Sequence, residues 1–351
     1  VTKIHLSERN SNLIDFDYLC GMSVAVVILN YNGRKFLTEF LPIVLENTQD
    51  AAIYVADNGS SDDSLALLAS DFPSVNVLSW DKNLGYAGGY NYALGQIKAD
   101  YFVLMNSDIA PRKNWLTPLV AYFEANPLVA AAQPFLLDYQ KPEYFEYAGA
   151  AGGFWDAYGY PFCRGRLFDT LEKNEGQYKT SIVNWATGAC LMVRASVFHA
   201  VGGLDDYLFA HMEEIDLCWR MQRAGYNIAA VAESEVLHVG GGTLNKENPF
   251  KTYLNFRNNL ILLYKNLEPS KRFTTLFIRM ILDGIAGIKF LTEGKFGSFV
   301  AILKAHYGFY RYLLLEAKAP AIQSNWIKSY TGNILVDYFL RGKKKFDQIK
   351  F

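Results

Sequence analysis

The chain has 351 residues, of which 51% are hydrophobic and 20% are charged, and its formal net charge is −1. This composition is typical of a globular protein with one large or two smaller domains, and it excludes a disordered chain. The four cysteines include no C-x-x-C pair and no even, close spacing, which argues against a zinc site or a disulfide framework. We therefore expect a reducing, cytosolic setting.

The charges are unevenly distributed along the chain. Residues 265–351 hold 15 Lys and Arg residues against 6 Asp and Glu residues, which leaves 19 against 29 in residues 1–264. Residues 1–22 show none of the charged-then-apolar progression of a secretory signal. We predict that these first residues are an extension outside the fold.

Four apolar, β-branched runs stop abruptly at polar residues, and segments of helical length separate them. The runs are 24–32, 51–57, 75–80 and 101–108. Strands that alternate with helices predict an α/β protein with a parallel, doubly wound sheet, in which ligands bind at the carboxyl ends of the strands. Polar residues at all four ends indicate one shared ligand: Asn30, Asn32, Asp57, Asn83, Gly85, Asn106 and Asp108.

A glycine-rich link from Asn83 to Asn91 leads from the third run into a helix. Glycines such as Gly85 and Gly88 let the backbone approach a phosphate closely, and a helix N-terminus favours an anion. The link is not G-x-G-x-x-G, which argues against a dinucleotide-dependent oxidoreductase. Turn formation and helix capping are the structural alternative for the asparagines of the strand ends.

The second half of the chain begins with residues 134–182, which are rich in Tyr, Phe, Gly and Pro and show little periodicity. They are either an insertion that contacts a ligand or a packed loop. Residues 184–193 predict a strand. Trp185 at its start packs either against a sugar face or in the core.

A helix is predicted over residues 209–225, with Gly225 as its C-cap. It carries the acidic pair Glu213 and Glu214, a position that the helix dipole also favours without any function. Asp216 and Arg220 are spaced i,i+4 in the order that favours an ion pair.

His238 ends another strand pattern and is followed by three glycines. It is either a structural histidine or a group that contacts a diphosphate or supplies a nitrogen to a metal. Arg257 follows on a helix, where it grips a phosphate or makes a surface salt bridge.

The pattern after Leu267 changes to helices with Lys and Arg scattered through apolar stretches. Apolar residues recur at steps of three and four between Phe296 and Leu314, which predicts one apolar face. No uncharged run approaches the ~20 residues of a membrane-spanning helix. Such basic helices suit either the plane of an anionic membrane surface or a helical subdomain packed on the rest of the chain or on a partner subunit.

Taken together, these patterns resemble glycosyltransferase family 2, in its rhamnosyltransferase-like branch. The resemblance covers about residues 23–265, in the right order. The matching stretches are N-Y-N at 30–32, D-N-G-S-S-D at 57–62, N-x-G-x-x-x-G-x-N at 83–91, N-S-D at 106–108, 188–194, 201–205, 213–220, His238 and Arg257 with Asn258.

The resemblance implies a GT-A fold that binds a nucleotide-diphosphate sugar. It divides the chain into a nucleotide-sugar-binding half over residues 23–133, an acceptor and catalytic half over 134–266, and a basic amphipathic helical region over 267–351. The implied nucleotide-sugar-binding residues are Asn30, Asn32, Asp57, Asn83, Gly85, Gly88, Asn91, Asn106, Asp108 and Arg257, and the implied acceptor-side residues are Trp185, Gly188 and Asp205.

Two acids have specific roles on the donor side in this resemblance. Asp57 matches the position that accepts a hydrogen bond from the base, and a carboxylate suits the N3–H of uracil or thymine and repels neutral cytosine. Asp108 matches the last acid of a D-x-D metal motif, whose first acid is replaced here by Asn106. The implied cofactor is Mg²⁺ or Mn²⁺ at Asp108, helped by His238, which would neutralise the leaving diphosphate.

The catalytic base matches Glu214, with Glu213 beside it. The family's usual residue here is Asp, so Glu213 and Asp205 remain alternatives for the base.

The function implied by the resemblance is inverting transfer of a sugar, rhamnose by branch, from a UDP- or dTDP-sugar to a glycan or lipid-linked glycan in cell-surface polysaccharide synthesis. We expect a cytoplasmic enzyme that is peripheral on an anionic inner membrane face and has no nucleic-acid partner. The alternative is a catalytically silent, membrane-associated binding module of a polysaccharide assembly.

Overall fold

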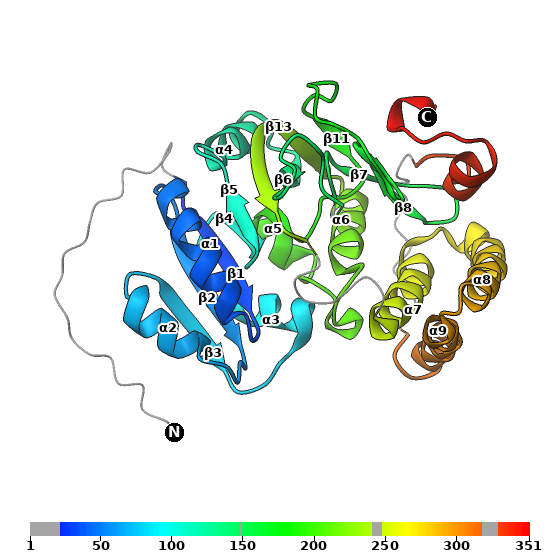
Figure 1. The fold of residues 1–351 in the computed structure, drawn as a ribbon, viewed down its shortest axis with the longest axis horizontal. Coiled ribbons are helices and arrows are strands. Elements are labelled where there is room, and N and C mark those ends of the chain that lie inside the picture. The colour runs from blue at the N-terminus through cyan, green and yellow to red at the C-terminus, as the bar shows by residue number, and fades with distance from the viewer. Residues whose placement is uncertain (1–21, 148, 241–247, 318–328) are drawn as a thin grey trace.

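The computed structural model describes residues 22–147, 149–240, 248–317 and 329–351. The expected N-terminal extension lies outside the described residues, apart from Met22. Within the described residues, nine strands form one sheet with the order β11-β13-β6-β12-β4-β1-β2-β3, and β5 pairs with β13 (Figure 1). The bounds are β1 Val24–Asn30, β2 Ala52–Asn58, β3 Asn76–Trp80, β4 Tyr101–Asn106, β5 Ile109–Pro111, β6 Val129–Asp138, β11 Ser181–Val183, β12 Cys190–Arg194 and β13 Asn227–His238.

The four strands expected from the first apolar runs lie side by side and parallel. β1 pairs with β2 and β4, and β2 pairs with β3. The second half adds the parallel pair β6 and β13, whereas β5, β11 and β12 run antiparallel to their neighbours. The predicted α/β architecture with a mostly parallel sheet is confirmed.

Helices cover both faces of this sheet, as expected for strands that are apolar on both sides. Side chains of α1, α2 and α4 pack with one set of strand residues, and those of α3, α5, α6 and α7 pack with the other set (Figure 1). The helices are α1 Arg34–Asn47, α2 Ser64–Asp71, α3 Gly85–Leu94, α4 Leu116–Ala125, α5 Ala195–Ala200, α6 Glu213–Arg223, α7 Pro249–Asn266, α8 Pro269–Thr292 and α9 Phe296–Leu315.

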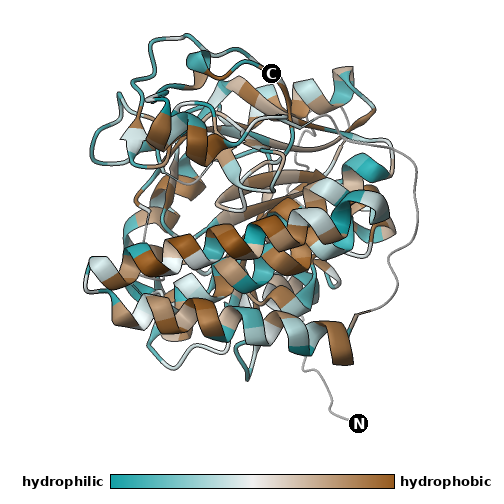
Figure 2. Cartoon of the chain, turned by 90° about the vertical axis from the view of Figure 1, so that its right-hand side faces the viewer, coloured by the Kyte–Doolittle hydropathy of each residue, from teal (hydrophilic) through white to brown (hydrophobic). Residues whose placement is uncertain are grey.

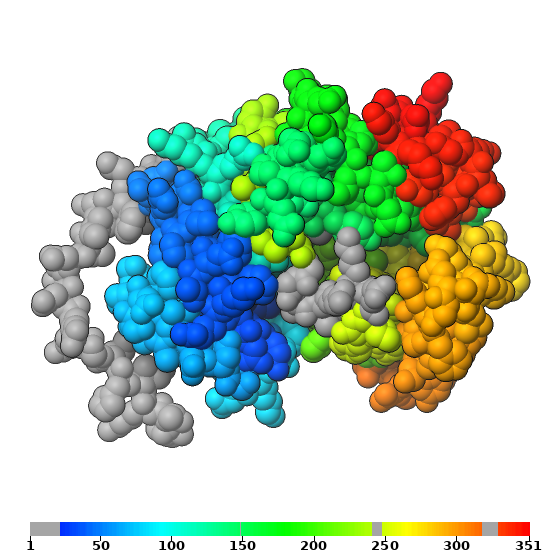
Figure 3. Space-filling view, in the orientation of Figure 1, coloured from blue at the N-terminus to red at the C-terminus, as the bar shows by residue number. Residues whose placement is uncertain are grey.

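The segment 134–182 contains a second, small antiparallel sheet. Its strands are β7 Gly153–Trp155, β8 Pro161–Cys163, β9 Arg166–Leu167 and β10 Thr170–Leu171. The C-terminal residues 329–351 pack on this sheet through Tyr330, Ile334, Tyr338 and Ile349, and Figure 3 shows this red segment against the green region. The tail therefore includes a part bound to the small sheet, after the helices that the sequence predicts.

Helices α8 and α9 lie in the region over residues 267–351 that the sequence predicts to be helical, and they pack with α7 at one side of the molecule. Figure 2 shows apolar residues running along the helices on that side. Large side chains of α8 and α9 are exposed: Phe273, Phe277, Ile281, Ile285, Ile288, Phe296, Leu303, Tyr307, Tyr310, Leu314 and Leu315. None of the helices in the described part of the chain is long and apolar enough to span a membrane.

Candidate active site

The polar ends of the first strands meet at one edge of the sheet. Asn30 of β1 is the register partner of Asp57 on β2, and Leu29 is the partner of Asn106 on β4. The structure therefore brings together the residues that the sequence predicts as one ligand-binding edge.

Asp57 is buried and anchors this edge. Its carboxylate accepts hydrogen bonds from Asn30 Nδ2 at 2.9 Å and from the Ser60 amide at 2.9 Å, one to each oxygen. Ser60 also accepts from the Asn32 amide at 2.9 Å, and Asn32 Oδ1 accepts from the Ser61 amide at 2.7 Å. The loops after β1 and β2 are thus tied together by side chains, and Ser60, which lies within the D-N-G-S-S-D match, is a further member of the site.

Asn58, the second residue of the D-N-G-S-S-D match at the end of β2, organises the glycine-rich link. Its Oδ1 accepts from the Leu84 amide at 2.9 Å, and its Nδ2 donates to the Gly85 carbonyl at 2.9 Å. Asn83 Oδ1 accepts from the Gly85 amide at 2.8 Å. The signal for Asn58 was its place directly after Asp57 at the strand end.

Two residues of the link face the second half of the chain. Asn91 donates to the Leu204 carbonyl at 2.8 Å and accepts from the Leu204 amide at 2.9 Å. A Cβ on Gly88 would lie 3.8 Å from Asp206 Oδ1. The hydrogen bonds of Asn91 join α3 to the loop before α6, so Asn91 has a bonding role within the protein.

Asp108 and His238 meet, as expected for two ligands of one site. His238 Nε2 lies 3.2 Å from Asp108 Oδ1, and His238 Nδ1 lies 3.0 Å from Glu146 Oε2. Burial opposes the charged imidazole, but hydrogen bonds to Asp108 and Glu146 and the charges of both carboxylates raise the pKa of His238 to about 10. In the absence of a cation, the imidazolium bridges the two acids.

This arrangement fits a hard divalent cation that shares its ligands with a substrate. Asp108 offers a carboxylate oxygen and His238 a ring nitrogen, which are both ligand types for a divalent cation once the proton between them is displaced. Glu146 occupies the place of an acid that orients a ligating histidine. Across the described residues, no group of three or more His, Cys, Asp or Glu side chains could hold a metal alone. Mg²⁺ is commonly held by one or two protein groups together with substrate phosphates.

The acidic pair stands at the start of α6. Glu213 is 4% exposed and Glu214 is partly buried. Among the described residues, Oε2 of each has no hydrogen-bond partner. Burial, together with the neighbouring Glu214 charge, raises the pKa of Glu213 well above its usual range, and burial raises the pKa of Glu214 to about 7. An acid with a pKa near 7 suits proton abstraction near neutral pH.

The start of α6 differs from the prediction. The sequence predicts a helix from residue 209, but α6 begins at Glu213, because Phe209, His211 and Met212 have φ of 64°, 69° and 75°. This left-handed backbone is costly for residues other than glycine. Asn258 of α7 holds it in place by donating to the carbonyls of Leu208, Ala210 and His211.

Gly188 lies beside the acidic pair, as expected for the acceptor side. Tyr86 Oη donates to the Gly188 carbonyl at 2.5 Å, and a Cβ on Gly188 would lie 2.7 Å from that hydroxyl and 3.6 Å from Glu214 Cβ. Tyr86 belongs to α3, so this contact joins the donor edge to Glu214. In the sequence, Tyr86 is marked only by its place in the glycine-rich link.

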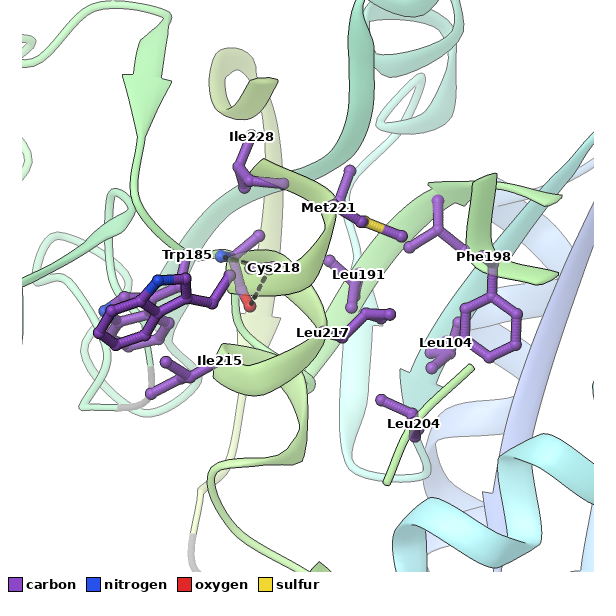
Figure 4. Close-up of a cluster of buried hydrophobic side chains, with 14 of the residues drawn as sticks. Leu104, Trp185, Leu191, Phe198, Leu204, Ile215, Leu217, Cys218, Met221 and Ile228 are labelled. Atoms are coloured by element: carbon purple, nitrogen blue, oxygen red, sulfur yellow. Dashed lines mark hydrogen bonds between the residues drawn. The ribbon is translucent and has the colours of Figure 1, made fainter. Parts of the chain in front are cut away.

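Trp185 is in the core and does not present a face to a sugar. It is 6% exposed, and its Nε1 donates to the Phe154 carbonyl at 2.9 Å. Figure 4 shows its indole beside Ile215 and Cys218 of α6. The prediction of an acceptor-side role for Trp185 is corrected by this burial, which matches the alternative of core packing.

Asp205 is engaged by a cation. Lys265 Nζ lies 2.6 Å from Asp205 Oδ2 and 2.9 Å from Asp216 Oδ1. The expected pair of Arg220 and Asp216 forms at 2.7 Å. Burial alone would raise the pKa of Asp216, but Arg220 and Lys265 lower it to about 2. These acids are therefore charge-paired, whereas Glu213 and Glu214 form no ion pair with described residues.

Arg257 turns towards the loop before α6. Its Nη2 donates to the carbonyls of Tyr207 and Leu208 at 3.2 Å each, and its Nη1 lies 3.2 Å from Tyr253 Oη. Of the two predicted roles of Arg257, the surface salt bridge is not formed with any described residue, and the phosphate contact stays a prediction.

The chain is similar in sequence to known glycosyltransferases. The model of the family described as Glycosyl transferase family 2 matches residues 25–202. An N-acetylglucosaminyl-diphospho-decaprenol L-rhamnosyltransferase of Mycobacterium tuberculosis is 28% identical over 233 residues, which cover 61% of this chain and 75% of the relative. The rhamnosyltransferase WbbL of Escherichia coli K12 is 24% identical over 224 residues, which cover 61% of this chain and 83% of the relative.

The fold also matches solved structures. A crystal structure of GalNAc-T7 with UDP, GalNAc and Mn²⁺ superposes with a TM-score of 0.54 at 16% identity, over 70% of this chain and 48% of that one. The comparisons support an enzyme rather than a catalytically silent module. The chain belongs to glycosyl transferase family 2, in its rhamnosyltransferase-like branch, and is a glycosyltransferase with a GT-A-like fold.

Proposed function

We propose that this enzyme transfers a sugar of the rhamnose type, with inversion, from a UDP- or dTDP-sugar to a lipid-linked glycan acceptor in cell-surface glycan synthesis. The names of the two rhamnosyltransferase relatives support the sugar, and the decaprenol-linked substrate in the name of one of them supports the acceptor class. The observation that carries the reaction is Glu214, a carboxyl group with a pKa near 7 that lies beside Gly188, whose carbonyl accepts a hydrogen bond from Tyr86 of α3.

The base specificity rests on Asp57. Each carboxylate oxygen accepts one hydrogen bond within the protein, which leaves further lone pairs as acceptors for an N–H. The N3–H of uracil or thymine is such a donor, whereas neutral cytosine offers a lone pair there and is repelled.

Asp108 and His238 would hold Mg²⁺ or Mn²⁺, with Glu146 orienting the imidazole. The bound cation supplies neutralisation of the charge on the diphosphate as it leaves. Binding of the cation would displace the Nε2 proton that His238 shares with Asp108, whereas the Nδ1 proton would stay in the hydrogen bond to Glu146.

In the transfer step, the acceptor hydroxyl oxygen forms a bond to the anomeric carbon on the face opposite the diphosphate. Glu214 takes the hydroxyl proton, and the bond between the anomeric carbon and the diphosphate oxygen breaks with its electron pair staying on the nucleoside diphosphate. Glu213, which stays protonated because of its raised pKa, adds no second charge next to the base.

We also propose that α8 and α9 place the enzyme on an anionic membrane surface. On α8, exposed Phe273, Phe277, Ile281 and Ile285 repeat every four residues and so form one stripe. A stripe of this kind, with an excess of basic residues in residues 265–351, suits an interfacial helix.

The test is calorimetric titration of the purified protein with UDP, dTDP, GDP, CDP and NADH, each with Mn²⁺ and again with EDTA. We expect selective, Mn²⁺-strengthened binding of UDP or dTDP, followed by transfer from the matching sugar donor. Absence of nucleotide binding would overturn the proposed donor, and equal binding in EDTA would remove the cation from the proposal.

A further inference from the structure

Helices α7 and α9 enclose a basic groove of about 400 Å³ with the loop before α6. The side chains that line it include three cations and three tyrosines: Arg257, Lys304, Arg311, Tyr207, Tyr253 and Tyr307. Gly308 also lines the groove, and a Cβ there would lie 3.0 Å from Tyr253 Oη and 3.1 Å from Arg257 Cδ, so the absence of a side chain lets α9 pack closely against these two side chains.

The groove carries a surplus of positive charge. Glu316 is its one acidic lining residue, against Arg257, Lys304 and Arg311. Within the described part of the chain, none of the three cations forms an ion pair. Guanidinium, ammonium and phenol groups together are the donors that bind phosphate oxygens.

Arg257 is fixed before any ligand binds. Its guanidinium is held by Tyr253 Oη and by the carbonyls of Tyr207 and Leu208. Leu208 also accepts from Asn258, and its loop runs directly into Glu213. The groove and the acidic pair are therefore built on the two ends of one short loop.

An exposed apolar surface continues from the same groove. Tyr307 and Leu315 line it and are 72% and 65% exposed. Tyr310 and Leu314, which are 51% and 83% exposed, follow at helical spacing on α9. A ligand whose phosphates fill the groove can thus lay a hydrocarbon chain along α9.

We propose that this groove binds the diphosphate of an isoprenoid-lipid-linked acceptor. The proposal rests on the proposed function, because it deepens the acceptor class. The charge surplus selects a polyanion, the adjoining apolar surface selects a lipid, and the Arg257 link to the loop before Glu213 sets the acceptor sugar on the side of the base.

The first experiment measures binding alone, with farnesyl diphosphate as a soluble probe in calorimetry. We expect the double variant Lys304→Ala/Arg311→Ala to bind it at least tenfold more weakly than the unmodified protein. Lys98→Ala, which removes another exposed lysine from the loop between α3 and β4, should bind farnesyl diphosphate with unchanged affinity. Unchanged affinity of the double variant, or no binding by the unmodified protein, would overturn the proposal.

Two further probes separate the sources of phosphate. Inorganic pyrophosphate should bind more weakly than farnesyl diphosphate, because it lacks the chain that lies on α9. Vesicles of phosphatidylglycerol should bind the double variant nearly as well as the unmodified protein. A double variant that loses vesicle binding but keeps farnesyl diphosphate binding would assign the groove to lipid headgroups and overturn the proposal.

The second experiment uses transfer to two acceptors that carry the same sugar, one on an isoprenyl diphosphate and one as an alkyl glycoside. For the first acceptor only, the KM of the double variant should be at least tenfold higher than that of the unmodified enzyme. Its kcat should stay within about twofold of the unmodified value for both acceptors. An equal rise for both acceptors would contradict a diphosphate site. If the unmodified protein bound no nucleotide in the calorimetric titration above, the proposed function would be wrong. The farnesyl diphosphate experiment does not depend on that result, so the two failures can be told apart.

Discussion

The carbonyl oxygen of Phe209 accepts hydrogen bonds from the amides of Tyr86, at 2.7 Å, and Ala87. Phe209 belongs to the strained loop before α6, and Tyr86 to the first turn of α3 in the glycine-rich link. The sequence predicts that the first amides of α3 face a phosphate, but in the structure the amides of residues 84–87 donate to Asn58, Asn83 and the Phe209 carbonyl. The start of α3 is thus joined to the loop that positions the acidic pair.

At Gly85, the contact between α3 and the loop before α6 leaves no room for a side chain. It has φ of +75°, and a Cβ would lie 2.5 Å from the Phe209 ring and 2.7 Å from its carbonyl oxygen. We expect Gly85→Ala to lower the free energy of unfolding by about 2 kcal/mol or more, from strain and overpacking. Gly284→Ala on α8, which meets nothing within 4 Å, should raise it by about 0.5 kcal/mol. Urea unfolding of both variants measures the difference, and similar effects would contradict the close contact.

Glu214→Gln should remove sugar transfer while keeping the nucleotide site. We expect kcat to fall about 10²- to 10⁴-fold, which is the usual contribution of a general base, with the Kd for the nucleotide within a few fold. Single-turnover transfer and calorimetry provide the two values. Turnover close to that of the unmodified enzyme would move the base elsewhere.

The pH dependence of transfer follows from the pKa of Glu214, about 7. The base acts in its ionised form, so kcat/KM should rise with pH through about 7 and then level off. Residual activity of Glu214→Gln should lack this rise. A flat profile between pH 5.5 and 8 in the unmodified enzyme would argue against Glu214 as the base.

Glu213 has a raised pKa, which predicts a pH-dependent effect on stability. Above pH 4.5 the unfolded state loses this proton while the folded state keeps it, so the free energy of unfolding falls as pH rises towards the raised value. Glu213→Gln cannot ionise and should escape this loss. The Tm of the variant relative to the unmodified protein should therefore increase from pH 4.5 to pH 8. A constant difference in Tm would show that Glu213 ionises normally.

Asp108→Asn should abolish the effect of Mn²⁺ on nucleotide binding. The amide carries no charge and is a poorer ligand for a hard cation than a carboxylate, and His238 then loses one of its two acidic partners. Calorimetry with Mn²⁺ and with EDTA should give equal affinities in the variant. Asp100→Asn, which changes a carboxylate that bonds Ser23, is the matched control and should keep the effect.

Replacing part of the apolar stripe should release the enzyme from membranes. Phe277 and Ile281 are 58% and 50% exposed on α8. The double variant Phe277→Glu/Ile281→Glu should bind phosphatidylglycerol vesicles at least tenfold more weakly, as measured by co-sedimentation. The reason is that each large apolar side chain contributes about 1.5 to 3 kcal/mol when it is buried. Leu128 is 62% exposed and lies outside these helices. The control variant Leu128→Glu should therefore bind the vesicles as well as the unmodified protein does. Equal loss in both variants would refute the assigned surface.

Local sequence patterns were enough to predict the donor edge. Asn30, Asp57 and Asn106 end apolar runs, and parallel strands place such ends together, so the α/β fold and this cluster follow from periodicity. The resemblance to the family added the meeting of Asp108 with His238, which are 130 positions apart in the chain. The roles of these residues in binding remain predictions.

Only the tertiary structure decided how the second half is assembled. The start of α6 at Glu213 depends on bonds from Asn258, the burial of Trp185 depends on α6, and the pairing of Asp205 depends on Lys265. These contacts join segments that lie far apart in the sequence, and they override local preference: Phe209 and Met212 adopt backbone angles that no propensity favours. Sequence determines which groups are available at each strand end and helix start, whereas burial and long-range partners decide which of them remain free to react.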